Sequence, residues 1–172
     1  VNREALLRPL QQVAGAVERR QTLPILSNVL LDVDAGQLSL VGTDLEVELL
    51  GRVAVSDGEG GRITVPGRKL MDIVRQLPER ADVHAELEGS SLAVRSGTFN
   101  SVLSTLGAED FPTVEKSAGE VSFKIDSKAL KQVLDKTAFA MAQQDVRFFL
   151  NGMLIEISEG SLRAVATDGH RL

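Results

Sequence analysis

Two stretches of the sequence decide the fold, because they are copies of one another: LSNVLLDVDAGQLSLVGTD at residues 26–44 and LNGMLIEISEGSLRAVATD at residues 150–168. A single shift of 124 positions aligns residues 5–48 with residues 129–172 without a gap. Chance does not sustain a gapless register of this length, so we infer an internal repeat. The sequence therefore predicts one complete unit followed by the opening of a second. Identical pairs include Ala5 and Ala129, Leu6 and Leu130, Leu10 and Leu134, Leu26 and Leu150, Leu30 and Leu154, Gly36 and Gly160, Leu38 and Leu162, Val41 and Val165, and Thr43-Asp44 and Thr167-Asp168.

A finer repeat of about sixty residues lies inside the first unit. Residues 1–13, 65–77 and 125–137 each have the pattern of a strand end followed by an amphipathic helix. The middle stretch is clearest, because its apolar residues follow the spacing i, i+3, i+4 and i+7 of one helical face. These residues are Leu70, Ile73, Val74 and Leu77. We expect helical segments at residues 2–20, 66–80 and 126–147.

Strand patterns follow each expected helix. Residues 28–34 and 37–41 flank an Ala-Gly turn, and residues 151–158 and 161–165 flank a Glu-Gly turn, as in β-hairpins. Alternating apolar and acidic residues at 44–49 predict a strand with one polar face. Further expected segments are strands at 81–88, 91–95 and 99–105, a flexible hairpin connection at 57–61 and a linker at 108–120. Each half-unit therefore has one strand, one helix and three strands, which predicts an α+β domain with helices on one face of an antiparallel sheet.

The composition bounds the class of protein. The chain has 172 residues, of which 43% are hydrophobic and 25% charged, as in soluble globular proteins and unlike disordered, collagen-like or coiled-coil chains. The absence of cysteine excludes disulfides and Cys-ligated metal sites, and it fits a reducing cytoplasm. No apolar run approaches the ~20 residues of a membrane span.

Charge is distributed unevenly along the chain. The formal net charge is −5, yet the three expected helical segments hold twelve basic and seven acidic residues, so they carry +5 and the remainder −10. If these helices share one side of the sheet, they form a positive layer suited to a polyanion. The alternative is ordinary solvated helix faces with pairs such as Arg68–Asp72 and Arg75–Glu79. Only 3% of residues are aromatic, so a nucleic-acid ligand would be double-stranded and contacted through its backbone.

The candidate catalytic groups have simpler interpretations. His84 lies in an expected strand and is interpreted as a surface residue. Asp168 and His170 could form an acid–base pair, but no nucleophile motif accompanies them and the same Thr-Asp recurs at residues 43–44 without the histidine. Recurrence favours a structural turn in which the aspartate accepts backbone N–H groups. We therefore expect no enzymatic activity, no cofactor and no metal site.

Phe148, Phe149 and Leu150 form the densest apolar cluster of the second unit. Such clusters usually belong to the core. Partial exposure beside residues 169–172 would instead create a hydrophobic pocket for a peptide.

Five motifs together resemble one family, the bacterial DNA sliding clamp, the beta subunit of DNA polymerase III. They are TLPIL at residues 22–26, GTDLE at 42–46, VPGRK at 65–69, QDVR at 144–147 with LNG at 150–152, and ATDGHRL at 166–172. The resemblance implies a DNA-clamp fold in a three-domain parent of roughly double this length, two copies of which close head to tail into a homodimeric ring. Residues 1–120 would be domain one with its first strand truncated, and residues 121–172 the first half of domain two.

The resemblance also implies a function and its residues. The function is that of a cytoplasmic, non-enzymatic processivity factor without cofactors, which encircles double-stranded DNA without sequence specificity. Its partners would be the DNA polymerase III alpha subunit, the clamp loader, other polymerases and repair proteins, each docking a short apolar peptide. The implied DNA-binding residues are Arg20, Arg68, Arg75, Gln143 and Gln144. The implied peptide pocket comprises Leu150, Thr167, Gly169, His170, Arg171 and Leu172. The implied ring interface comprises Lys69, Ile73, Phe99, Asn100, Ser101, Val102 and Leu103.

Two departures from the family pattern bear on these sites. Thr98 and Asn100 stand where some relatives have basic residues, which weakens the charge component of the ring interface. Phe148 and Phe149 replace a pair that can be tyrosine, which removes hydroxyls able to reach DNA or water. An alternative function from another class is a peptide-docking scaffold that never holds DNA.

Overall fold

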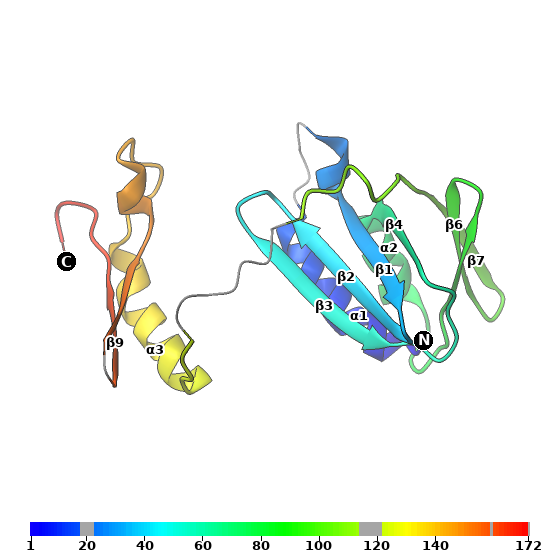
Figure 1. Ribbon diagram of the computed structural model, residues 1–172, viewed down its shortest axis with the longest axis horizontal. Coiled ribbons are helices and arrows are strands. Elements are labelled where there is room, and N and C mark those ends of the chain that lie inside the picture. The colour runs from blue at the N-terminus through cyan, green and yellow to red at the C-terminus, as the bar shows by residue number, and fades with distance from the viewer. Residues whose placement is uncertain (18–22, 114–121, 159, 172) are drawn as a thin grey trace. The chain divides into compact units, whose positions relative to one another are not determined.

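The computed structural model describes residues 1–17, 23–113, 122–158 and 160–171. The chain divides into two compact units, Val1–Lys116 and Ser117–Leu172, which are described one at a time (Figure 1). The predicted α+β class with antiparallel sheets is confirmed.

The first unit contains a four-stranded antiparallel sheet in the order β3-β2-β1-β4. Its strands are β1 (Asn28–Asp34), β2 (Gln37–Thr43), β3 (Glu48–Ala54) and β4 (Gly61–Pro66). The predicted Ala-Gly hairpin turn joins β1 to β2, with φ of 46° at Ala35 and 77° at Gly36. Two consecutive positive φ angles suit the right-handed twist of the flanking strands, which fixes the register in which Leu30 faces Val41.

Two local predictions about this sheet were wrong. The strand expected at 44–49 begins only at Glu48, because the Asp44 carboxylate draws residues 44–47 into a turn. The segment at 57–61 is not a hairpin connection, because it joins β3 and β4, which lie at opposite edges of the sheet. Alternation of residue types could not distinguish these arrangements, since it records local periodicity and not strand order.

Two helices cover one face of the sheet (Figure 1). Helix α1 (Arg3–Val13) packs on β2 and β3, while α2 (Gly67–Gln76) packs on β1 and β4. The apolar stripe of α2 is buried at Leu70 and Val74, as its spacing predicted. The core between helices and sheet is formed mainly by Leu6, Leu10, Val13, Val29, Leu31, Leu40, Val53, Val65, Leu70 and Val74.

The helices are shorter than expected. Helix α1 gives way to a 3₁₀ turn at Ala14–Ala16 and α2 ends at Gln76, because Leu77 is extended before Pro78. Arg80 therefore lies outside the helix, and Arg19 and Arg20 lie outside the described residues. The three α-helices nevertheless hold eight basic and three acidic residues, so their net charge is still +5.

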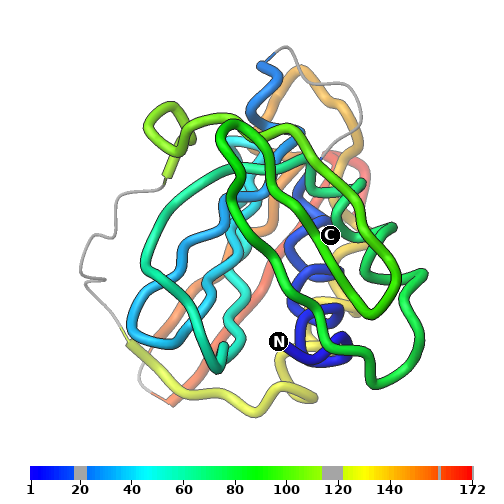
Figure 2. The backbone as a smooth tube through the Cα atoms, turned by 90° about the vertical axis from the view of Figure 1, so that its right-hand side faces the viewer, coloured from blue at the N-terminus to red at the C-terminus, as the bar shows by residue number. Residues whose placement is uncertain are grey.

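A second sheet of the first unit has the order β5-β6-β7 and can be followed as the green tube in Figure 2. Its strands are β5 (His84–Glu88), β6 (Ser91–Ser96) and β7 (Phe99–Ser104). His84 is exposed on β5, as predicted. Beyond β7, Leu106 exchanges two backbone hydrogen bonds with Thr64 of β4, which links the two sheets.

The boundary between the two units falls inside the linker expected at residues 108–120, whose residues 114–120 lie outside the described residues, but the first part of this stretch packs on the first sheet. Phe111 is 5% exposed and packs with Ala108 and Ile25 against Leu30 and Val41. Leu30 alternates with Val29 and Leu31, which face the helices, so Phe111 covers the opposite, outer face of the sheet.

The second unit contains one α-helix and one hairpin among its described residues. Helix α3 (Ser127–Thr137) packs on the hairpin of β8 (Leu154–Ser158) and β9 (Ser161–Val165). No strand precedes α3 in residues 122–126, contrary to expectation. The core interpretation of the Phe-Phe-Leu cluster is wrong for its aromatic residues: Phe148 is 81% exposed and Phe149 67%, whereas Leu150 is buried.

Candidate functional sites

The repeated Thr-Asp pair forms the same turn in both units. In the first unit, the Thr43 hydroxyl accepts the Leu45 N–H at 3.0 Å. The Asp44 Oδ1 accepts the N–H groups of Glu46 at 3.0 Å and Val47 at 2.7 Å. The Val47 and Glu46 N–H groups are also the leading causes that lower the pKa of Asp44. The Asp44 carboxylate therefore acts as a hydrogen-bond acceptor for two backbone N–H groups of its own turn.

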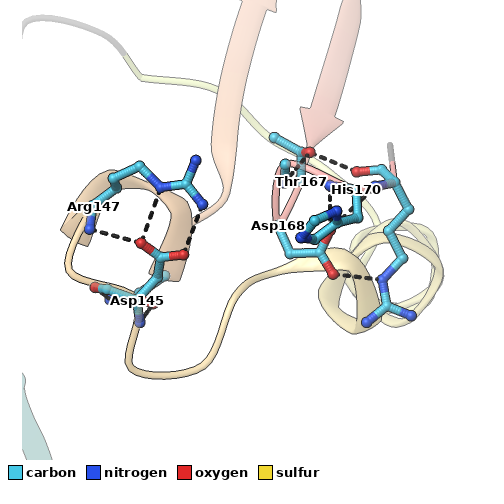
Figure 3. Close-up of polar contacts among 8 residues, drawn as sticks. Asp145, Arg147, Thr167, Asp168 and His170 are labelled. Carbon is cyan, nitrogen blue, oxygen red and sulfur yellow. Dashed lines mark hydrogen bonds and ion pairs between the residues drawn. The ribbon is translucent and has the colours of Figure 1, made fainter.

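The second copy of the turn contains the histidine. Thr167 Oγ1 accepts the Gly169 N–H at 3.0 Å, and Asp168 Oδ1 accepts those of His170 at 2.9 Å and Arg171 at 3.1 Å (Figure 3). The pKa of Asp168 is lowered first by the His170 N–H. Asp168 therefore bonds to the backbone of His170, and the predicted structural turn is confirmed in both units.

Arg171 is fixed to this turn by its own side chain. Its Nε lies 2.9 Å from Asp168 Oδ2, and its carbonyl accepts the Thr167 hydroxyl at 2.5 Å. Its guanidinium carbon lies 5.9 Å from the centroid of the Phe139 ring, within cation–π range. The turn consequently presents Gly169, His170 and Arg171 as an exposed and ordered loop.

A second loop lies beside this turn and is organised by Asp145. Arg147 donates to Asp145 Oδ1 from its backbone N–H at 2.8 Å and from Nε at 3.0 Å, and its Nη2 donates to Oδ2 at 2.9 Å (Figure 3). The Asp145 N–H and C=O each pair with the Asn151 amide at 3.0 Å. The Arg147 side chain is the leading cause that lowers the pKa of Asp145 to about 2, and the charge of His170 adds to it.

The two loops meet at Gly169. A Cβ atom placed on Gly169 would lie 3.5 Å from both terminal nitrogens of Arg147, so the guanidinium packs against the glycine. The implied pocket residues therefore lie on two adjoining loops of one unit, with Leu150 buried and the glycine exposed. Leu172 lies outside the described residues. The sequence analysis gave Arg147 no role in this site. The QDVR motif nevertheless contained a signal, because an aspartate two residues before an arginine can pair with it.

The implied DNA-binding residues differ in how freely they can reach a ligand. Arg75 is exposed on α2, with its Nη1 3.9 Å from Asp72 Oδ1. Arg68 is half-buried and its Nη2 donates to the Val17 carbonyl at 2.8 Å, so it holds the chain just beyond α1 and its 3₁₀ turn. The pairing of Arg68 with Asp72 and of Arg75 with Glu79 was wrong, because Arg75 pairs with Asp72 and Glu79 lies beyond the helix. Gln143 and Gln144 are exposed in the second unit, and Arg20 lies outside the described residues.

Arg3 has a structural role that the sequence did not suggest. Its Nε donates to the Val74 carbonyl at 3.1 Å and its Nη2 to the Arg75 carbonyl at 2.8 Å. These carbonyls lie in the last turn of α2, where intrahelical partners are lacking and the helix dipole favours a cation. Arg3 therefore fixes α1 to α2: its charge contributes to the positive layer, but its guanidinium is bound to the α2 carbonyls and is not free to contact a ligand.

The implied ring-interface residues lie on α2 and on the edge strand β7. Lys69 is exposed and Ile73 half-buried on α2. On β7, Val102 is 58% exposed, Phe99 38% and Leu103 only 5%, while Asn100 is exposed and Ser101 half-buried. In the part of the chain that the structure describes, residues 99–104 pair only with β6, which leaves one strand edge for a further strand.

Two features are absent from the described residues. No helix among them is long and apolar enough to cross a membrane. They also contain no group of three His, Cys, Asp or Glu side chains placed to hold a metal ion.

Repeated antiparallel sheets with helices on one face place the chain in the α+β class, and solved structures of DNA sliding clamps share this fold with TM-scores of 0.93 and 0.96. The chain belongs to the DNA polymerase III beta subunit family: the N-terminal domain of that subunit matches residues 1–115 and its central domain matches residues 124–172.

Named relatives agree with this assignment. The chain is 60% identical to the beta sliding clamp of Pseudomonas aeruginosa and 53% identical to that of Escherichia coli, over the whole chain and 47% of each relative. The structure of the Pseudomonas aeruginosa DNA polymerase III subunit beta aligns over 99% of the chain and 46% of its own length, with a TM-score of 0.96 and 58% identity. That of Caulobacter crescentus aligns over 99% and 47%, with a TM-score of 0.90 and 39% identity. The chain thus spans about half the length of the relatives it matches.

Proposed function

We propose that this chain is part of a processivity factor that encircles duplex DNA without sequence specificity and tethers a replicative polymerase to it. Two findings together carry the proposal. The chain belongs to the DNA polymerase III beta subunit family, and its helices are positively charged although the chain as a whole is acidic. The α-helices hold +5 although the whole chain holds −5, and in the first unit both helices cover the same face of the sheet.

A protein that encircles DNA stays on it for as long as the ring is closed. Its residence time on DNA therefore does not depend on how tightly it contacts the phosphates. Exposed cations such as Arg75 attract phosphates, and such contacts exchange readily with water and salt. A ring therefore slides along the duplex, while its escape requires the ring to open. We assign DNA contact to Arg20, Arg68, Arg75, Gln143 and Gln144, and expect Arg68 to contribute least because the Val17 carbonyl holds it.

We further propose that the two loops joined at Gly169 form part of a docking pocket for short apolar peptides. Leu150, Thr167, Gly169, His170, Arg171 and Leu172 would line it. The expected partners are the DNA polymerase III alpha subunit, the clamp loader, other polymerases and repair proteins. The rigid Asp145–Arg147 and Asp168–Arg171 pairs support this role, because a pre-ordered site loses less entropy on binding.

We also infer a head-to-tail homodimeric ring in a polypeptide as long as the relatives. The edge of β7 and the exposed face of α2 would form one side of its heterologous interface. Residues 1–120 would form domain one and residues 121–172 the first half of domain two. The factor would act in the cytoplasm and would need no cofactor. It would not be an enzyme, because the aspartates of its two Thr-Asp turns accept hydrogen bonds from backbone N–H groups.

A second candidate is a peptide-docking scaffold that never holds DNA. Exposed Phe148 and Phe149 beside the proposed pocket favour it, because exposed aromatic side chains are typical of protein-binding surfaces.

Charge reversal separates the two candidates. Arg75 lies on the helix face and Arg62 on the outer face of the same sheet, so Arg75→Glu and Arg62→Glu change the net charge equally. In a polypeptide as long as the relatives, we expect Arg75→Glu to reduce loading onto nicked circular DNA several-fold and Arg62→Glu to leave it unchanged. Equal loading of both variants and the parent would favour the scaffold. Arg68→Glu is unsuitable, because it would also remove the bond to Val17.

A further inference from the structure

The side-chain amide of Asn151 closes the loop that Asp145 organises. Its Oδ1 accepts the Asp145 N–H and its Nδ2 donates to the Asp145 carbonyl, each at 3.0 Å. The amide thus exchanges two hydrogen bonds with the backbone of residue 145, as two residues of paired strands do. Asn151 is the last residue of the 3₁₀ turn Phe148–Asn151, so this amide pairing ties the turn to the loop before it.

The amide pairing is connected to the loop that contains Gly169. Asp145, with its backbone fixed by Asn151, holds the Arg147 side chain through Nε at 3.0 Å and Nη2 at 2.9 Å. The terminal nitrogens of Arg147 in turn pack against Gly169. A continuous series of contacts within the second unit therefore leads from the Asn151 amide to both loops of the proposed pocket.

The equivalent residue of the first unit has no amide. Under the repeat of 124 positions, Asn151 and Gly152 correspond to Ser27 and Asn28. The Ser27 hydroxyl donates to the Pro24 carbonyl at 2.6 Å, inside its own 3₁₀ turn. The amide pairing is therefore a feature of the second unit, where it borders the proposed pocket.

Asn151 is also followed by glycine, the neighbour that hinders deamidation least, because it has no Cβ atom to obstruct ring closure. In this reaction the Gly152 backbone nitrogen attacks the Asn151 Cγ. The side-chain nitrogen leaves as ammonia and takes the proton of the attacking nitrogen. Water then opens the succinimide ring to aspartate or isoaspartate, so water is consumed and ammonia released without an oxidant or reductant. The sequence contains Asn-Gly only at this position.

We propose that Asn151 is a site of spontaneous deamidation and that the modification releases the Asp145 loop. An aspartate at this position still offers an oxygen to the Asp145 N–H. Its second oxygen replaces Nδ2, cannot donate, and would lie 3.0 Å from the Asp145 carbonyl oxygen. Two acceptors repel at this distance, so the pairing opens and Arg147 loses the fixed partner that holds it against Gly169.

The intact pairing also governs how fast the reaction occurs. Two hydrogen bonds and the 3₁₀ turn fix the Asn151 amide in the folded chain, so its Cγ becomes free for attack only when the loop opens locally. Loss of an ordered pocket wall would weaken peptide docking, and this consequence alone rests on the proposed function.

The role of the amide pairing is tested by amide hydrogen exchange in the isotope-labelled chain. The Arg147 N–H donates to Asp145 Oδ1 at 2.8 Å, so its exchange rate reports on the loop. We expect Asn151→Asp and Asn151→Ala each to raise this rate about fivefold, as for the loss of one hydrogen bond. Gln132→Glu makes the same change from amide to carboxylate at an exposed position of α3 and should leave the rate unchanged.

The modification itself is tested by incubating the purified chain at mildly alkaline pH and locating deamidation by mass spectrometry of its proteolytic peptides. We expect Asn151 to react about tenfold more slowly in the folded chain than in urea, and faster in folded Arg147→Ala than in the folded parent. Gly152→Ala should suppress the reaction in both states. A Cβ atom at Gly152 would meet no atom nearer than the Phe149 carbonyl oxygen at 3.8 Å, so this variant keeps the fold.

Three outcomes would overturn the proposal. Equal deamidation rates in the folded and unfolded chain would show that the pairing does not protect Asn151. No deamidation of the folded chain after the unfolded chain has reacted completely would remove the modification site. A deamidated chain in which the Arg147 N–H exchanges as it does in the fresh chain would show that the loop stays closed. A failure of peptides to bind the proposed pocket would contradict the proposed function and alter none of these results.

Discussion

Leu45 adopts a backbone conformation that its side chain disfavours. Its φ is +79°, and the residue at the same place in the second Thr-Asp turn is Gly169, with φ +88°. The left-handed region is strained for residues with a Cβ atom and easy for glycine. The Thr43 hydroxyl, which accepts the Leu45 N–H, holds the leucine in this strained conformation.

We therefore predict that Leu45→Gly is more stable than Leu45→Ala by about 1 kcal/mol. Both substitutions remove a side chain that is 57% exposed, so the difference isolates the backbone. Urea unfolding of the two variants measures it. Equal midpoints would show that the turn stores no strain.

The Asp145 carboxylate gives a prediction about pH. Its pKa is lowered from 3.8 to about 2, chiefly by the Arg147 side chain. Because the folded pKa lies below the ordinary value, the stabilising contribution of this pair is fully present above an ordinary aspartate pKa and is lost as the pH falls from 3.8 toward about 2. Carboxyl NMR should give a midpoint near 2 that returns toward 3.8 in Arg147→Ala. A midpoint unchanged by this substitution would contradict the assigned cause.

At the scale of elements, α1 and α2 are joined by two arginines that run in opposite directions. Arg3 of α1 reaches the last carbonyls of α2, and Arg68 of α2 reaches Val17 beyond α1. The two helices therefore cover the sheet as one layer.

We predict that Arg3→Ala destabilises the first unit by about 2 kcal/mol, since two charge-assisted hydrogen bonds are lost. Arg3 is 14% exposed at its side chain, whereas Arg8 on the same helix is exposed. Arg8→Ala should therefore change the unfolding free energy by less than about 0.5 kcal/mol. Guanidinium unfolding followed by circular dichroism compares them, and equal losses would refute the role of Arg3.

Phe111→Ala should destabilise the first unit by about 3 kcal/mol, because it empties a buried aromatic site between Leu30 and Val41. Phe148→Ala, at a residue 81% exposed, should be nearly neutral. Thermal unfolding of both variants provides the comparison. A neutral Phe111→Ala would mean that the packing of Phe111 on the sheet contributes little to stability.

The sequence predicted what is local and repeated. The gapless shift identified the two hairpins and the Thr-Asp turn, because the same short-range hydrogen bonds recur at Asp44 and Asp168. It could not predict that β3 and β4 lie at opposite edges, since strand order depends on contacts far apart in the chain. For the same reason Arg3, Arg68 and Phe111 looked like surface or linker residues, although each is held by a partner at least 51 positions away.

At the scale of the whole molecule, the distribution of charge supports the proposed function. The chain is acidic overall, whereas the α-helices among its described residues together carry a net charge of +5. A cationic layer on an acidic body attracts a polyanion to one face and repels it elsewhere. In the proposed ring, retention on DNA would then need no tight contact.

The most direct test of encirclement is retention on DNA that is circular or linear. A polypeptide as long as the relatives is loaded onto nicked plasmid, and the complex is passed through a sizing column in salt high enough to remove simple phosphate contacts. We predict that the protein stays with circular DNA and is lost when the plasmid is cut once. The 172-residue chain alone should be lost from both. Equal retention on circular and linear DNA, or retention of the chain alone, would contradict the account.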